Sequence, residues 1–316
     1  MTRVLVTGAA GQIGSALVPA LREAYGSEAV LATDLRPTQD PARGPSGTLD
    51  CTEVGQLRDV VRSHRPDVVY HLAALLSAVG ERSPQKAYEV NLGGLFNVLE
   101  AAREQSFAVF TPSSIAAFGP STPRDLTPQD TLQRPTTMYG VTKVAGELLC
   151  DYYHSRYGVD TRGVRYPGII SAAAPGGGTT DYAVEIFFSA VRDGTYSCFL
   201  SDDTQLDMMY MPDALRAAME LMEADGSRLR HRNAFNVTAM QLTPRRLGDA
   251  IRHHIPDFFL GHEPDPMRQA IADSWPHEID DTAAREEWGW NPQYDLETMT
   301  AEMLSLVRDQ VATRTP

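Results

Sequence analysis

The chain has 316 residues, with 28 Lys and Arg against 41 Asp and Glu, and a formal net charge of −13 at pH 7. This acidic balance argues against a general nucleic-acid-binding protein, which needs a basic surface. Three scattered cysteines, Cys51, Cys150 and Cys198, are too few for a disulfide framework or a structural zinc site. They favour a reducing compartment, and we expect the cytoplasm.

The sequence also argues against a membrane protein. No apolar run approaches the roughly 18 residues that span a bilayer. The first two residues lead directly into an apolar segment at 3–7, which leaves no room for a signal peptide. We therefore expect neither a membrane nor a nucleic-acid partner.

Short apolar runs alternate with amphipathic helical periods through the first half of the chain. This alternation predicts parallel strands with helices on both faces, an α/β fold with a Rossmann-type doubly wound sheet. The expected strands are 3–7, 29–33, 47–50, 67–72, 108–111 and 164–166. The expected helices are 13–25, 53–63, 84–105 and 139–157.

The pattern loosens after the sixth expected strand. Residues 119–137, rich in Pro and Thr, predict a surface loop. We expect residues 1–169 to form one domain, with some later segments returning to it, and 170–316 to form mainly a smaller α+β subdomain that binds substrate. Further helices are expected at 213–222, 245–254 and 281–288.

A glycine-rich segment, TGAAGQIG at positions 7–14, joins the first expected strand to the first expected helix. In that context Gly8 permits a tight turn, Gly11 lets the backbone approach a pyrophosphate, and Gly14 lets helix and strand pack closely. The helix N-terminus offers N–H groups to the anion. The residues expected at the dinucleotide are Gly8, Gly11, Gln12, Ile13 and Gly14.

Asp34 closes the second expected strand, about 20 positions after the last of these glycines. A carboxylate there binds the ribose 2′-hydroxyl and repels a 2′-phosphate, which favours NAD over NADP. Leu35 and Arg36 follow in the same cofactor-binding segment, with Arg36 packing on the adenine or facing solvent. Two roles are open to Asp50, binding the adenine amino group or capping the next helix.

Tyr139 and Lys143 are spaced four residues apart on an expected helix, so their side chains share one face. A positive charge beside a phenol lowers its pKa, which predicts that Tyr139 is a usable general base near neutral pH. Ser114 lies at the carboxyl end of the fifth expected strand, the edge where ligands bind. Its hydroxyl is expected to hold the substrate oxygen.

Together these motifs resemble the extended branch of the short-chain dehydrogenase/reductase family. The segments HLAA at 71–74 and NLGG at 91–94 match that branch as well. The resemblance implies a Ser114–Tyr139–Lys143 triad, with Lys143 also bound to the nicotinamide ribose. It adds to the cofactor site Leu72, Ala73, Ala74, Asn91, Tyr166 and Ile169. His71 on its own is interpreted as a satisfied strand histidine.

Two departures argue against a nucleotide-sugar substrate. Members that act on such sugars usually carry an arginine for the diphosphate where this chain has Leu206. The sugar dehydratases among them also carry an acidic pair where this chain has Ile115 and Ala116. The chain is instead similar to the short-chain-type L-threonine 3-dehydrogenases. That likeness rests on segments 175–183, 208–214 and 272–276.

This second resemblance implies oxidation of L-threonine at C3 to 2-amino-3-oxobutanoate. Thr179 and Thr180 would hold the carboxylate and Asp181 the ammonium group, although Thr180 and Asp181 are equally expected as helix caps. Ser77 is a pocket hydroxyl or a solvent-facing serine, and Trp275 shields the site or belongs to the core. The glycines at 176–178 suggest a loop that closes over substrate.

The resemblance also implies a homodimer formed by the helices at 84–105 and 139–157, and 2-amino-3-oxobutanoate CoA ligase as the metabolic companion. We expect no metal, because the adjacent His253 and His254 do not face one another on a helix. Two alternatives are kept, a nucleotide-sugar epimerase or dehydrogenase and a non-catalytic NAD sensor.

Overall fold

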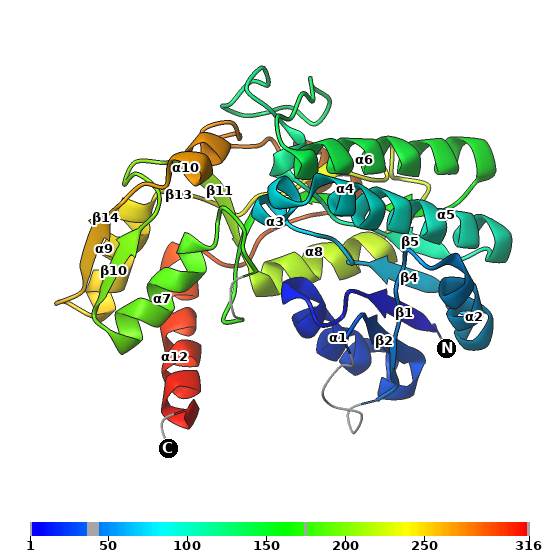
Figure 1. Ribbon diagram of the computed structural model, residues 1–316, viewed down its shortest axis with the longest axis horizontal. Helices are drawn as coiled ribbons and strands as arrows, with labels where there is room; N and C mark the ends of the chain where they lie inside the picture. The colour runs from blue at the N-terminus through cyan, green and yellow to red at the C-terminus, as the bar shows by residue number, and fades with distance from the viewer. Residues whose placement is uncertain (1, 37–43, 174–175, 315–316) are drawn as a thin grey trace.

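The computed structural model describes residues 2–36, 44–173 and 176–314. Its centre is a parallel sheet of six strands in the order β3-β2-β1-β4-β5-β7 (Figure 1). The reversal of strand order beside β1 is the doubly wound arrangement predicted from the sequence. The strands are β1 (Val4–Thr7), β2 (Val30–Asp34), β3 (Ser46–Thr48), β4 (Val68–His71), β5 (Ala108–Phe110) and β7 (Thr161–Arg162).

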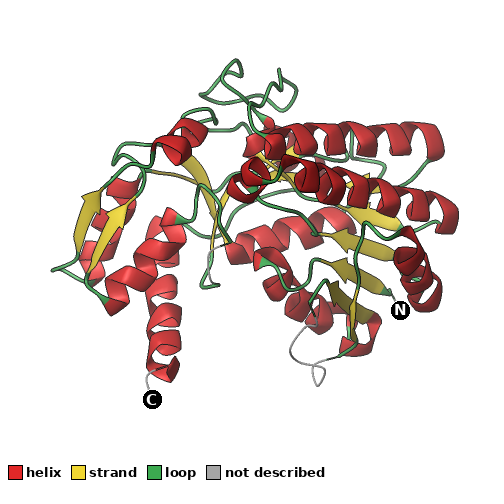
Figure 2. Ribbon diagram, in the orientation of Figure 1, coloured by secondary structure: helices red, strands yellow, loops and turns green. Residues whose placement is uncertain are grey.

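Strand β1 shows why the sheet needs helices on both faces. Its Val4 and Val6 side chains pack with α1 (Gln12–Tyr25) and α8 (Met211–Glu223). Leu5, which points to the opposite face, packs with three other helices. These are α2 (Val54–His64), α5 (Gly94–Gln105) and α6 (Met138–Tyr157). Figure 2 shows the strands enclosed by these helices.

Two expectations about this part of the chain are wrong in detail. The helix expected at 84–105 is interrupted, because a π-helical turn at Tyr88–Gly93 separates α4 (Pro84–Ala87) from α5. The strand β8 (Val164–Tyr166) is not the sixth strand of the main sheet, a place taken by β7. It pairs instead with β6 (Ser113–Ser114) and β12 (Phe235–Asn236).

The second half of the chain builds a separate core on two small sheets. One contains β9 (Gly168–Ile170), β11 (Leu206–Tyr210) and β13 (Met240–Leu242), and the other β10 (Thr195–Cys198) and β14 (Phe259–His262). The helices around them include α7 (Tyr182–Arg192), α9 (Pro244–His254) and α12 (Leu296–Arg314), on the left of Figure 1. The remaining helices are α3 (Ser77–Arg82), α10 (Pro266–Ala272) and α11 (Thr282–Trp288).

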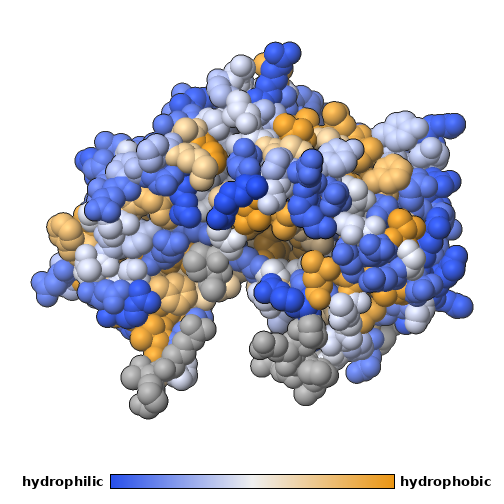
Figure 3. Space-filling model, viewed as in Figure 1, coloured by the Kyte–Doolittle hydropathy of each residue, from blue (hydrophilic) through white to orange (hydrophobic). Residues whose placement is uncertain are grey.

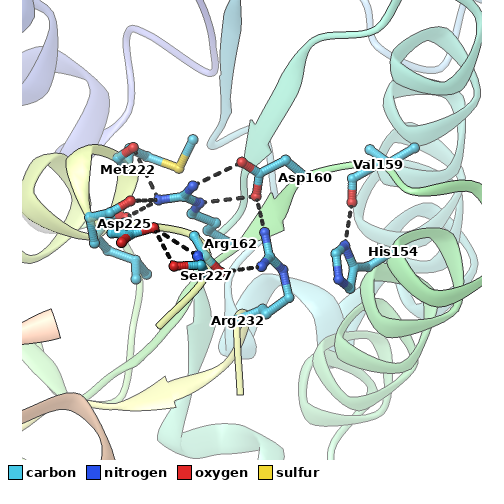
Figure 4. Close-up of polar contacts among 11 residues, drawn as sticks. His154, Val159, Asp160, Arg162, Met222, Asp225, Ser227 and Arg232 are labelled. Carbon is cyan, nitrogen blue, oxygen red and sulfur yellow. Dashed lines mark hydrogen bonds and ion pairs between the residues drawn. The ribbon is translucent and has the colours of Figure 1, made fainter. Parts of the chain in front are cut away.

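A buried arginine ties α8 to the edge of the main sheet (Figure 4). Arg162 binds both carboxylate oxygens of Asp160, at 3.0 and 2.9 Å. Burial acts to raise the pKa of Asp160, but hydrogen bonds and charge from Arg162 and Arg232 outweigh it and lower that pKa. The Arg162 guanidinium also donates, at 2.7 to 3.2 Å, to the last carbonyl groups of α8, those of Leu221, Met222 and Ala224.

We predict that Arg162→Met lowers the free energy of unfolding by about 3 kcal/mol, because it leaves three carbonyl groups without their donor and leaves Asp160 with Arg232 alone. Urea denaturation measures the change. The matched control is Arg58→Met, which removes an exposed pair with Glu104 and should cost less than about 1 kcal/mol. Equal losses in the two variants would contradict this role.

Candidate active site

The glycine-rich segment forms the turn between β1 and α1 with the geometry a dinucleotide needs. Gly8 has φ of 73°, and a Cβ there would lie 2.6 Å from the backbone nitrogen of Ala73. A Cβ on Gly14 would lie 2.4 Å from the Gly8 carbonyl oxygen. A Cβ on Gly11 would meet only that same oxygen, at 3.2 Å, so this side of the turn is otherwise open.

Helix α1 begins at the open side of the turn. Its N-cap residue is Gly11, which supplies no side-chain cap, so the N–H groups of the first turn are available to an anion. Asp34, at the end of β2, accepts hydrogen bonds from the backbone N–H groups of Ala10 (3.0 Å) and Arg36 (3.2 Å). These residues therefore fit an adenine dinucleotide, with Leu35 and Arg36 both exposed beside Asp34.

Asp50 does not cap the next helix, which was one of its two expected roles. Helix α2 begins later and its N-cap residue is Glu53. The Asp50 carboxylate accepts hydrogen bonds from the hydroxyl and the N–H group of Thr52, at 2.7 and 2.9 Å, and these bonds lower its pKa. Contact with the adenine remains a prediction.

Ser114, Tyr139 and Lys143 all line one cleft. Ser114 ends β6, and Tyr139 and Lys143 lie in the first turns of α6, which Thr137 caps through its side chain. The Lys143 ammonium lies 5.3 Å from the centre of the Tyr139 ring and donates a hydrogen bond to the Pro112 carbonyl at 2.7 Å. The spacing of the three residues in the sequence thus predicted their meeting correctly.

The expected pKa of Tyr139 is wrong for the protein without its cofactor. Burial raises the pKa of Tyr139 to about 12, and the hydrogen bond with Ser114 offsets only part of this rise. Burial also lowers the pKa of Lys143 to about 8. The interaction with Lys143 is therefore not enough to bring the phenol pKa near neutrality, because burial of both groups dominates.

The cleft encloses about 790 Å³, part of it open to solvent. In the same view as Figure 1, Figure 3 shows the molecule hollowed between the part that carries α1 and the part that carries α7 and α12. Every expected substrate residue, Ser77, Thr179, Thr180 and Asp181, lines the cleft, as does Trp275. Among the described residues the buried hydroxyl of Thr179 has no hydrogen-bond partner, so a ligand would relieve a desolvation cost there.

Asp181 is held by the glycine loop and is not a side-chain cap. It occupies the N-cap position of α7 without making a cap hydrogen bond. Its carboxylate accepts from the N–H groups of Gly177 (2.7 Å) and Gly178 (2.8 Å). Burial raises the pKa of Asp181, although these bonds act in the opposite direction. Pro175, expected in this loop, lies outside the described residues.

The family-derived cofactor residues divide into two groups. Leu72, Ala74, Tyr166 and Ile169 line the cleft, whereas Ala73 and Asn91 line the smaller pocket beside it. The amide of Asn91 instead binds the backbone of Leu75, accepting from its N–H (2.7 Å) and donating to its carbonyl (3.0 Å).

One ring nitrogen of His71 has a hydrogen-bond partner, as expected for a histidine in a strand. Its Nδ1 lies 2.8 Å from the Thr7 hydroxyl, and burial lowers its pKa to about 3, so the ring is neutral.

Sequence reasoning missed Gly168, which lines the cleft and at which a Cβ would lie 2.7 Å from the Thr180 methyl group. A glycine inside a strand was the available signal.

The arginine position at which nucleotide-sugar enzymes are expected to bind the diphosphate does not face this cleft. Leu206 is fully buried in the core of the second half of the chain. Within the described residues, no arginine lines the cleft, and no group of three or more His, Cys, Asp or Glu could hold a metal ion. None of the described helices is long and apolar enough to cross a membrane.

The profile of the NAD dependent epimerase/dehydratase family matches residues 4–238, and the chain belongs to this family. Its cofactor is NAD, and it is an NAD-dependent enzyme of the extended short-chain dehydrogenase/reductase type.

Three relatives cover nearly the whole chain. An uncharacterized epimerase/dehydratase of Staphylococcus saprophyticus is 54% identical over 97% of both chains. The L-threonine dehydrogenase of Clostridium difficile is 50% identical, with a TM-score of 0.96 over 98% of both chains. A monomeric L-threonine 3-dehydrogenase from a metagenome database is 45% identical, with a TM-score of 0.94 over 97% of this chain and 99% of that one.

We predict that Asp34→Ser weakens NADH binding about tenfold and strengthens NADPH binding, because it removes both the ribose acceptor and the charge that repels a 2′-phosphate. Fluorescence titration with each nucleotide measures the two affinities. Asp50→Ser is the control, expected to weaken both nucleotides alike. An unchanged NADH to NADPH ratio in Asp34→Ser would contradict the assignment.

Proposed function

We propose that this protein oxidises L-threonine at C3 to 2-amino-3-oxobutanoate and that NAD accepts the hydride. The observation that carries the proposal is the composition of the cleft. Beside Ser114, Tyr139 and Lys143 it offers one carboxylate and several hydroxyl groups, but no arginine among the described residues. Such a set suits a small zwitterion better than a diphosphate, and it agrees with the L-threonine dehydrogenases that the chain resembles.

The chain's own residues supply the acid–base part of the reaction. The Ser114 hydroxyl holds the substrate alcohol, and the Tyr139 phenolate accepts the alcohol proton as the C3–O bond becomes a carbonyl. When held at the glycine-rich turn and Asp34, NAD would accept the hydride from C3. The ammonium of Lys143 stabilises the phenolate and, as the family resemblance implies, would also hold the nicotinamide ribose.

The substrate's charged ends are bound at the start of α7. We assign the ammonium group to Asp181, whose carboxylate the glycine loop fixes in place. The unpartnered Thr179 hydroxyl and Thr180 take the carboxylate, and Ser77 adds a further hydroxyl to the wall. Trp275, 5% exposed, closes the cleft against water.

We predict NADH formation with L-threonine that accelerates as pH rises from 6 toward 8, the value to which burial lowers the pKa of Lys143, because above it the ammonium that stabilises the phenolate is lost. The reason is that burial raises the pKa of Tyr139 to about 12, so only a small fraction of Tyr139 is phenolate in this range, and that fraction grows with pH. Absorbance of NADH measures the rate. Tyr139→Phe should lose about 10²- to 10⁴-fold while still binding NADH, and a rate independent of pH or of Tyr139 would contradict the mechanism.

The same assay separates the alternatives. A nucleotide-sugar enzyme, the class that the Staphylococcus relative's name leaves open, would show no threonine turnover, and UDP-sugars would raise its melting temperature. A non-catalytic NAD sensor would bind NADH without turnover of either substrate. We expect neither behaviour.

We predict that Asp181→Asn raises the KM for L-threonine at least about tenfold with little change in NADH affinity, because the ammonium loses its counter-charge. An amide oxygen can still accept from Gly177 and Gly178, so the loop should keep its shape. In the parent protein the KM should rise as pH falls and Asp181 gains a proton, since burial raises its pKa. Asp193→Asn, at the exposed far end of α7, is the control. An unchanged KM in Asp181→Asn would remove this residue from the site.

We also propose a cytoplasmic homodimer, with 2-amino-3-oxobutanoate CoA ligase consuming the unstable β-keto acid. All three cysteines are free and buried, as a reducing compartment allows. The outer faces of α5 and α6 expose the apolar side chains of Phe96, Val141, Leu148 and Tyr152, and a matching face on a second copy would cover them.

We predict that sedimentation shows a dimer and that Leu148→Glu, at a side chain 61% exposed, converts it to a folded monomer. Leu126→Glu, in the surface loop at 119–137 and equally exposed, is the control. A monomeric parent protein would contradict the dimer and leave the proposed reaction intact, since a monomeric L-threonine 3-dehydrogenase is among the relatives.

A further inference from the structure

One side chain joins the cofactor half of the cleft to the substrate half. Gln12 is the first residue of α1, next to the open side of the glycine turn. Its Nε2 donates to the Ser171 hydroxyl at 3.0 Å and lies 3.5 Å from the carbonyl oxygen of Ile169. Ile169 lies within β9 and Ser171 directly follows the strand, whose first residue, Gly168, faces the methyl group of Thr180, 2.7 Å from where a Cβ on Gly168 would lie.

The acceptor side of this link is well fixed. Ser171 is buried, 3% exposed, and β9 is paired with β11 just before it. The next residue, Ala172, is held from the other direction, since its carbonyl accepts from Nε2 of Gln310 on α12 at 3.0 Å. Two glutamine amides therefore hold successive residues of one segment, but only Gln12 belongs to the cofactor loop.

The donor side of the link depends on what the cofactor does to the backbone. The first N–H groups of α1 have no acceptor within the helix. An anion bound there fixes the backbone from which the Gln12 side chain extends, and so reduces the entropy that this side chain loses on holding Ser171. The bound cofactor and the hydrogen bond to Ser171 then favour the same position of the Gln12 side chain.

We propose that Gln12 is a positioning residue that couples the binding of NAD to the binding of the amino-acid substrate. The bound dinucleotide would order Gln12, Gln12 holds Ser171 at the end of β9, and β9 in turn packs at Gly168 against Thr180 of the substrate site. Linkage requires the coupling to be reciprocal, so substrate must tighten the dinucleotide by the same factor. The identity of the substrate rests on the proposed function, whereas the link from dinucleotide to Ser171 does not.

The coupling is measured by fluorescence titration of NADH with and without saturating L-threonine, a pair that cannot react because the cofactor is already reduced. We expect L-threonine to tighten NADH binding at least about fivefold in the parent protein and less than about twofold in Gln12→Ala. Gln310→Ala is the matched control and should keep the full effect. Coupling of equal size in Gln12→Ala and Gln310→Ala would overturn the proposal.

A second variant tests the route. Ser171→Ala removes the acceptor, so it should reproduce the loss seen in Gln12→Ala, and the double variant should lose no more than either single one. Additive losses would show that the two residues act separately and would contradict the link.

Hydrogen exchange tests the link without any substrate. NADH alone should slow amide exchange at residues 168–173 in the parent protein and in Gln310→Ala, but not in Gln12→Ala. Equal slowing in all three overturns the link. Slowing that depends on Gln12, in a protein that neither oxidises nor binds L-threonine, would sustain the link and refute the proposed function. Turnover of L-threonine without any coupling between NADH and L-threonine would support the proposed function and refute the link.

Discussion

The close approach of the glycine-rich turn to the end of β4 fixes the rest of the site. At Gly8 the backbone turns with φ of 73° and leaves no space for a Cβ beside Ala73. This contact sets where α1 begins and where the segment after β4 runs. That segment supplies Leu72 and Ala74 to the cleft and then leads into α3, which brings Ser77 to the wall. Cofactor and substrate walls are thus positioned by one backbone contact.

The catalytic groups are held in a setting that is costly for their charged forms. Burial disfavours both the phenolate of Tyr139 and the ammonium of Lys143. A phenolate and an ammonium side by side stabilise one another, whereas either charge alone is disfavoured there. The site therefore supports proton transfer when both ions form together.

The sequence predicted the parts of the protein that depend on local spacing. The glycine turn, the parallel sheet and the meeting of Ser114 with Tyr139 follow from residue periods and from the rule that ligands bind at the carboxyl edge. The π-helical turn at Tyr88–Gly93 was not predicted, because it is a local change in backbone hydrogen bonding that the residue types do not mark.

Other features depend on contacts between distant residues, which spacing does not encode. Gly163 separates β7 from β8 at a point where a Cβ would lie 2.2 Å from the Thr111 carbonyl oxygen. The pKa of Tyr139 depends on its burial, and the bonds of Asp181 depend on how the glycine loop folds over it. The link from Gln12 to Ser171 likewise spans the two halves of the chain.

The measurement that tests the central claim most directly uses L-threonine labelled with deuterium at C3. Hydride transfer from C3 in this cleft predicts one deuterium in the reduced cofactor per product formed, detected by mass spectrometry, and product formed about 10²- to 10⁴-fold more slowly with Tyr139→Phe. Reduced cofactor without deuterium, or no reduced cofactor from a protein that binds NAD, would contradict the proposed reaction.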